Sequence, residues 1–124
     1  MSKAEHYNRE LTEWKNSIDF YLDEIKILEE RLEEVAWKNT KPSITVNVEH
    51  FQNQFILQQE ALGILKHDIH AQQLKIEADI IPKNKLTDEE VIANQDLLRD
   101  RQQAAEKIFI ELKHSFYRFL SRVL

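Results

Sequence analysis

The sequence predicts an all-α fold, a long up-down-up antiparallel three-helix bundle in which residues 1–124 form one domain. Apolar residues recur at alternating steps of three and four along three long segments, as they do on one face of a helix. Two short polar segments, each holding one of the two prolines, separate the three. The chain has only one glycine, which leaves little turn chemistry for a many-stranded sheet.

The first segment predicts a helix from about residue 3 to residue 38. Its apolar residues follow a heptad pattern that resembles a coiled-coil seam. Phe20 and Ile27 lie outside this seam, seven residues apart at the heptad position c, where a polar residue is expected. The seam residues are Ala4, Tyr7, Leu11, Trp14, Ile18, Tyr21, Ile25, Leu28, Leu32 and Val35.

The second segment predicts a helix over residues 47–80. Pro42 disfavours helix in the residue before it, so we expect a turn there and the N-cap at Asn47. Val46 and Phe51 would then form a hydrophobic staple around that cap. The seam of this helix contains Val48, Phe51, Phe55, Leu62, Leu65, Ile69 and Ile76.

A further apolar line on the second helix contains Leu57 and Ile64, again seven residues apart. Gly63 lies beside this line, within the helix, where glycine costs about 1 kcal/mol relative to alanine. Two explanations stand side by side. Gly63 is either a neutral weak point or a place where a neighbouring helix approaches closely.

The third segment predicts a helix over residues 87–123. Thr87 as N-cap and Glu90 three residues later fit a capping box, with Leu86 and Val91 as its staple. The first half of the seam is thin and polar, and the second half is aromatic. Its residues are Val91, Gln95, Leu98, Gln102, Ala105, Phe109, Leu112, Phe116, Phe119 and Val123.

Four glutamines occupy seam positions where apolar residues are expected. They could fix the register of the helices through paired hydrogen bonds, or they could mark a wetter half of the core. We favour the first interpretation. The four are Gln58, Gln72, Gln95 and Gln102.

Composition restricts the compartment and the partners. The absence of cysteine removes disulfides and thiolate metal sites and suits a reducing compartment. The net charge is −5, and no segment is basic enough to indicate nucleic-acid binding. No apolar run approaches the roughly 20 residues of a membrane span, and the N-terminal residues lack a secretory signal. We expect a cytoplasmic protein that binds neither nucleic acid nor membrane.

Histidines offer the main alternative, a metal- or phosphate-handling helical bundle. His67 and His70 stand three residues apart, and Glu111 with His114 matches the Glu-x-x-His spacing of di-iron bundles. A di-metal site needs two such pairs directed inward, whereas these residues fall at outward positions of their helices. The sequence therefore predicts no metal or other cofactor.

Enzyme motifs are also missing. The chain has no Gly-x-Ser-x-Gly, no glycine-rich phosphate loop and no His-Glu-x-x-His. A histidine phosphotransfer domain has a similar size, but its exposed histidine is followed by a lysine three residues on and a nearby glycine. His67 is followed by Asp68, Ile69 and His70 instead. We expect no catalytic residues.

The apolar lines outside the seams are the candidate functional feature. A helix of a three-helix bundle buries one stripe, so additional apolar lines need another partner or a wide stripe. We expect a non-enzymatic interaction module whose helix-face interface binds another protein or a second copy of the chain. The candidate interface residues are Phe20, Ile27, Leu57 and Ile64.

One stretch carries a resemblance to a family. Residues 48–56, Val-Glu-His-Phe-Gln-Asn-Gln-Phe-Ile, with Lys-His-Asp-Ile at 66–69 downstream, resemble a group of small bacterial all-helical, coiled-coil-like proteins of unknown function. The resemblance covers most of the chain and implies a helical fold, with no activity, cofactor or site. Spectrin-type repeats are similar in architecture only, through the three-helix plan and a seam tryptophan, here Trp14.

Overall fold

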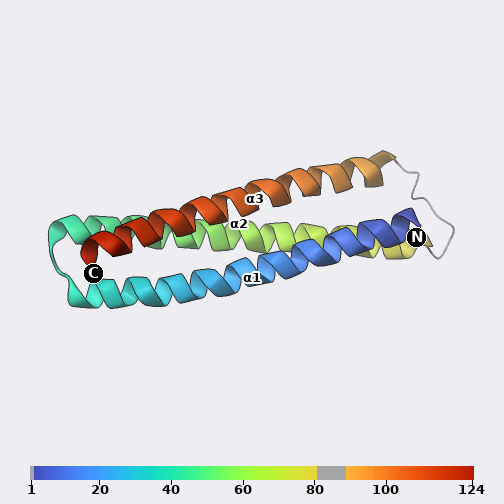
Figure 1. The fold of residues 1–124 in the computed structure, drawn as a ribbon. Helices are drawn as coiled ribbons and strands as arrows, with labels where there is room; N and C mark the ends of the chain where they lie inside the picture. Colours follow the sequence, from blue (N-terminus) through green and yellow to red (C-terminus); the bar gives the residue numbers. More distant parts are fainter. Residues whose placement is uncertain (1, 81–88) are drawn as a thin grey trace.

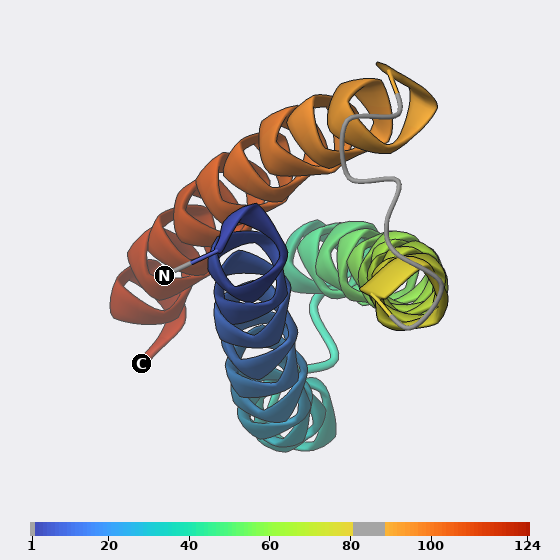
Figure 2. The same cartoon turned by 90° about the vertical axis from the view of Figure 1, so that its right-hand side faces the viewer.

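The structure is a computed structural model that describes residues 2–80 and 89–124. It contains α1 (Lys3–Lys38), α2 (Pro42–Ile80) and α3 (Glu89–Val123). Helix α2 runs antiparallel to α1, and α3 returns alongside both, so that the C-terminus lies near the turn between α1 and α2 (Figure 1). The end-on view shows the helices arranged around a common core (Figure 2). The predicted all-α, up-down-up three-helix bundle is confirmed.

The core follows the heptad seams. Every predicted seam residue of α1 is buried except Trp14, which is partly buried against the core. On α2 the buried apolar residues are again seven, three and four positions apart, because these steps return to the same side of a helix. Each helix therefore places one apolar stripe against its two neighbours, which is the arrangement that the sequence predicts.

Aromatic side chains fill the end of the bundle near the turn between α1 and α2. Phe116 of α3 packs against Phe51 and Phe55 of α2, with ring centroids 5.3 Å apart in both pairs and near-perpendicular ring planes. Phe119 lies 5.3 Å from Phe51. Edge-to-face pairs of this kind are favourable beyond the area they bury. The aromatic half of the third seam thus forms a buried cluster.

The start of α2 differs from the prediction, because the helix begins at Pro42 and includes the residues expected to precede the cap. Proline is well suited to the first turn of a helix, where its missing N–H would have no intrahelical acceptor. The carbonyl of Lys41 accepts the backbone N–H of Thr45. Asn47 does not cap the helix; its side chain donates to the carbonyl of Ser43 from within it. The predicted capping box at Thr87 lies outside the described residues.

Gly63 has no close neighbour in the structure. A Cβ atom built at this position meets nothing within 4 Å, so the bundle itself gives no close helix approach to explain the glycine. Gly63→Ala should therefore raise the free energy of unfolding of the monomer by about 0.5–1 kcal/mol, through helix propensity alone. Urea denaturation at protein concentrations where the chain is monomeric measures this gain, and a loss of stability would contradict it.

Candidate interaction surface

The four candidate interface residues are all more than half exposed. Phe20 and Ile27 on α1 are each 54% exposed, and Leu57 and Ile64 on α2 are 58% and 60% exposed. The wide-stripe explanation, in which a neighbouring helix would cover them, does not hold for these side chains. They need to be placed relative to α3, the helix that packs against both α1 and α2.

Leu57 and Ile64 lie at the edge of α2 that borders α3. Asp68 of α2 accepts a hydrogen bond from Arg101 of α3, 2.8 Å away, which identifies the side of α2 that faces α3. Ile64 lies one helical turn before Asp68, just outside that contact. On α3, Ile108 is seven residues after Arg101 and so lies on the same side of that helix, 51% exposed.

We call the surface that these side chains form the α2–α3 patch. It combines large aliphatic residues with alanines from the two helices, and all of its members are exposed. Contiguous apolar surface of this kind is uncommon on monomers unless it binds something. The patch contains Leu57, Ala61, Ile64, Ala71, Leu97, Ala104 and Ile108.

Phe20 and Ile27 lie at a different place, on the edge of α1 that borders the other side of α3. Glu24 of α1 forms an ion pair with Lys113 of α3 at 3.5 Å, and Phe20 and Ile27 flank Glu24 one turn away on either side. The corresponding residues of α3 are Ile110 and Tyr117, which are 42% and 45% exposed. We call Phe20, Ile27, Ile110 and Tyr117 the α1–α3 patch.

The candidate residues therefore belong to two surfaces, one on each side of α3. Sequence reasoning identified Phe20, Ile27, Leu57 and Ile64, but it missed Ala61 on α2 and the members on α3. Leu97 and Ala104 are seven residues apart, so the spacing that identified Leu57 and Ile64 could also have identified them. Ile108 and Ile110 stand directly before and after the seam residue Phe109. The three residues form one apolar run, so the heptad pattern did not mark the two isoleucines as exposed.

A buried polar layer crosses the other half of the bundle. The side-chain amide of Gln72 on α2 donates to the side-chain carbonyl of Gln95 on α3 at 3.1 Å and to the backbone carbonyl of Val91 at 3.0 Å. Asn94 donates to the Gln72 side chain at 2.7 Å. These contacts fit the register interpretation for Gln72 and Gln95. For Gln102, the side-chain oxygen is buried without a hydrogen-bond partner among the residues that the structure describes.

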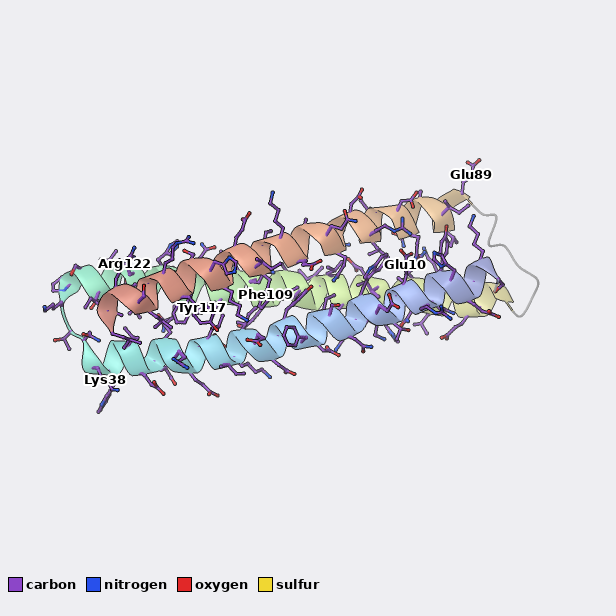
Figure 3. The ribbon with its side chains drawn as sticks, viewed as in Figure 1. Glu10, Lys38, Glu89, Phe109, Tyr117 and Arg122 are labelled. Atoms are coloured by element: carbon purple, nitrogen blue, oxygen red, sulfur yellow. The ribbon has the colours of Figure 1, made fainter. Side chains whose placement is uncertain are left out.

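Glu10 connects this layer to α1. Its carboxylate accepts hydrogen bonds from the Gln95 amide at 2.9 Å and from two nitrogens of the Arg99 guanidinium at 2.7 and 2.8 Å. Figure 3 shows Glu10 in the space between α1 and α3. Arg99 also pairs with Asp96 and lies over the ring of Trp14. The contacts with Glu10 fix the parallel alignment of α1 and α3.

The surroundings of Glu10 lower its pKa. Burial alone would raise the pKa of this carboxyl, but the hydrogen bonds from Arg99 and Gln95 and the charge of Arg99 together outweigh burial. The hydrogen bonds to Glu10 and Asp96 in turn raise the pKa of Arg99. Both groups are therefore charged at neutral pH, and their pairing contributes to stability there.

This lowered pKa predicts a loss of stability in acid. The contribution of Glu10 is fully present above the unfolded-state pKa of about 4.3 and disappears as the pH falls through the lower folded-state pKa. Glu10→Gln should therefore reduce stability at neutral pH and flatten its decline below about pH 4. Urea denaturation across that range measures the slope. An unchanged slope in the variant would contradict the assignment, and Glu13→Gln, at an exposed position of α1, serves as control.

The histidines point outward, as their heptad positions predict. His67, His70 and His114 are exposed, and so is Glu111. The His70 ring nitrogen Nδ1 lies 3.5 Å from the amine of Lys15. Within residues 2–80 and 89–124, no three His, Asp or Glu side chains come together in a way that could hold a metal ion. No helix of the same part of the chain is long and apolar enough to cross a membrane.

Comparison with known proteins finds no matching family model, no matching curated protein and no matching solved structure. The resemblance to small bacterial helical proteins stays a prediction.

Proposed function

We propose that this protein is a non-enzymatic interaction module that binds a second copy of itself or another protein through its outer helix faces. The observation that carries the proposal is the exposure of large aliphatic side chains on both sides of α3, in the α2–α3 patch and the α1–α3 patch. Burying a half-exposed leucine or isoleucine against a partner contributes of the order of 1 kcal/mol. Several such residues on one face therefore provide a substantial driving force for association.

The rest of the molecule fits a binding role. A neighbouring helix cannot rotate to cover the patches, because the polar layer around Gln72 and Gln95 and the aromatic cluster around Phe116 fix the orientation of each helix. The exposed side chains thus occupy fixed positions on a rigid surface, which lowers the entropy cost of binding. The lack of cysteine is consistent with a cytoplasmic location.

A photo-crosslinking experiment in intact cells tests the proposal. A benzophenone amino acid replaces Leu57 in one variant and Phe20 in another, and the control carries it at Arg9, an exposed position of α1 that lies 11 residues before Phe20. We expect discrete crosslinked products from Leu57 or Phe20, identified by mass spectrometry as the chain itself or a defined partner. Products of the same pattern and yield from Arg9 would show that the patches bind nothing specific.

A further inference from the structure

The side of α2 that faces away from the bundle has an unusual composition. Gln59 and Lys66 contact α1, and Asp68 contacts α3, so the remaining heptad positions b, c and f face outward. The amine of Lys15 on α1 comes within 3.5 Å of the His70 ring at the edge of this face. From residue 49 to residue 78, these outward positions contain no lysine or arginine. Their ionisable residues are glutamates and histidines alone. The central outward residues are Asn53, Ile56, Leu57, Glu60, Gly63, Ile64, His67, His70, Ala71 and Leu74.

Two glutamate–histidine pairs on this face are placed symmetrically about the peptide between Gly63 and Ile64. Glu60 stands three residues before Gly63, and His67 stands three residues after Ile64. The same relation holds further out, because His50 stands 13 residues before Gly63 and Glu77 stands 13 residues after Ile64. In an antiparallel pair of α2 helices centred on that peptide, Glu60 would meet His67 of the other copy and His50 would meet Glu77, whereas Glu49 would meet Ala78 and His70 would meet Leu57.

Two apolar pairs fit the same symmetry. An antiparallel pair centred there places Ile64 of one copy against Gly63 of the other, and Ile56 against Ala71. A large side chain thus meets a small one at both levels, as efficient packing requires. On the surface of α2, heptad positions b and c lie on opposite sides of position f. In the antiparallel pair, each b residue of one copy therefore meets a c residue of the other copy.

From this self-complementarity we propose that α2 docks on α2 of a second copy of the chain, antiparallel, with the two-fold axis beside the Gly63–Ile64 peptide. This inference rests on the proposed function and specifies its partner. It also explains Gly63: the glycine, which the monomer does not require, leaves a hollow that Ile64 of the second copy fills. A parallel pair would place Glu60 against Glu60, which like-charge repulsion disfavours.

The α2–α3 patch enlarges this interface. A stable interface buries roughly 800 Å² on each partner, more than a few side chains of one helix provide. Leu57 and Ile64 lie on the α3 side of the outward face, next to Ile108 and Ala104. The second copy would therefore cover the α2–α3 patch as well as the outward face of α2.

Disulfide trapping tests the register, because the natural chain contains no cysteine. Glu60→Cys and His67→Cys are prepared as separate variants. In the proposed dimer, residue 60 of one copy faces residue 67 of the other, whereas the two copies of residue 60 are separated by about 10 Å along the helix axis at 1.5 Å per residue. A disulfide requires Cα atoms within about 7 Å. An equimolar mixture should form a mixed disulfide dimer in a glutathione buffer, and neither variant alone should do so.

The outcomes separate this inference from the proposed function. Disulfide dimers from each variant alone would indicate a parallel pair and overturn the inference. A mixture that forms no more disulfide than the control pair, Asp23→Cys with Glu30→Cys on the outer face of α1, would also overturn it. In both cases specific photo-crosslinking from Leu57 or Phe20 would leave the proposed function standing. If that crosslinking were absent as well, the proposed function itself would be contradicted.

Gly63→Ala provides an independent readout. The added methyl group has free space in the monomer, but in the dimer it would occupy the hollow filled by Ile64 of the second copy. We expect the dimer dissociation constant to rise about tenfold, the cost of modest overpacking, while the monomer becomes more stable. An unchanged or smaller dissociation constant, measured by sedimentation equilibrium, would contradict the proposed contact.

Discussion

Phe116→Ala should lower the free energy of unfolding by about 3–5 kcal/mol, the usual cost of removing a fully buried phenylalanine. Phe116 has no exposed surface, and its ring contacts Phe51 and Phe55 of α2. The substitution leaves a cavity between α2 and α3, which two rigid helices cannot close by moving together. Urea denaturation followed by circular dichroism at 222 nm measures the change.

Trp37→Ala is the matched control for this substitution. It removes a larger aromatic side chain, but Trp37 lies at the end of α1 and is 87% exposed. We expect a change within about 0.5 kcal/mol, as for other surface substitutions. Equal effects of the two substitutions would contradict the assignment of Phe116 to the core.

Gln95→Ala should lower the free energy of unfolding by about 2 kcal/mol, because it leaves buried polar partners unsatisfied. Gln95 bonds to Gln72, to the backbone carbonyl of Tyr7 and to Glu10. Its removal therefore affects both interfaces of α3. Gln103→Ala, at an exposed position of the same helix, should have an effect within about 0.5 kcal/mol.

A double-mutant cycle isolates the contact between the two glutamines. Gln72→Leu and Gln95→Leu should each destabilise the protein, and the double variant should lose about 1 kcal/mol less than the sum of the two, because both single variants break the same hydrogen bond. Strict additivity in urea denaturation would show that the two side chains do not interact.

The fold was largely predictable from the sequence because heptad spacing specifies which side of each helix is buried. Leu11, Ile18 and Ile25 follow that spacing, and all three are fully buried. The start of α2 was missed because Pro42 carries two opposite signals. It ends a preceding helix, and it also favours the first turn of a following one; the prediction used the first signal alone.

The candidate surface was predictable only in part. Phe20 and Leu57 were identified by their position outside the seams, and they are exposed in the structure. That they belong to different patches depends on which side of each helix borders α3, and a heptad pattern read one helix at a time does not contain this information. The ion pair between Glu10 and Arg99 was missed for the same reason, since it joins residues 89 positions apart.

Native mass spectrometry of the unmodified chain, compared with Leu57→Glu/Ile64→Glu, tests most directly that the exposed apolar faces bind a second copy of the chain. The account predicts a dimer without metal for the unmodified chain and a folded monomer for the variant. Asn16→Glu/Thr40→Glu adds two acidic residues at exposed polar positions and should remain a dimer. The same distribution of species for the unmodified chain and Leu57→Glu/Ile64→Glu, or a monomer carrying stoichiometric metal, would contradict the account.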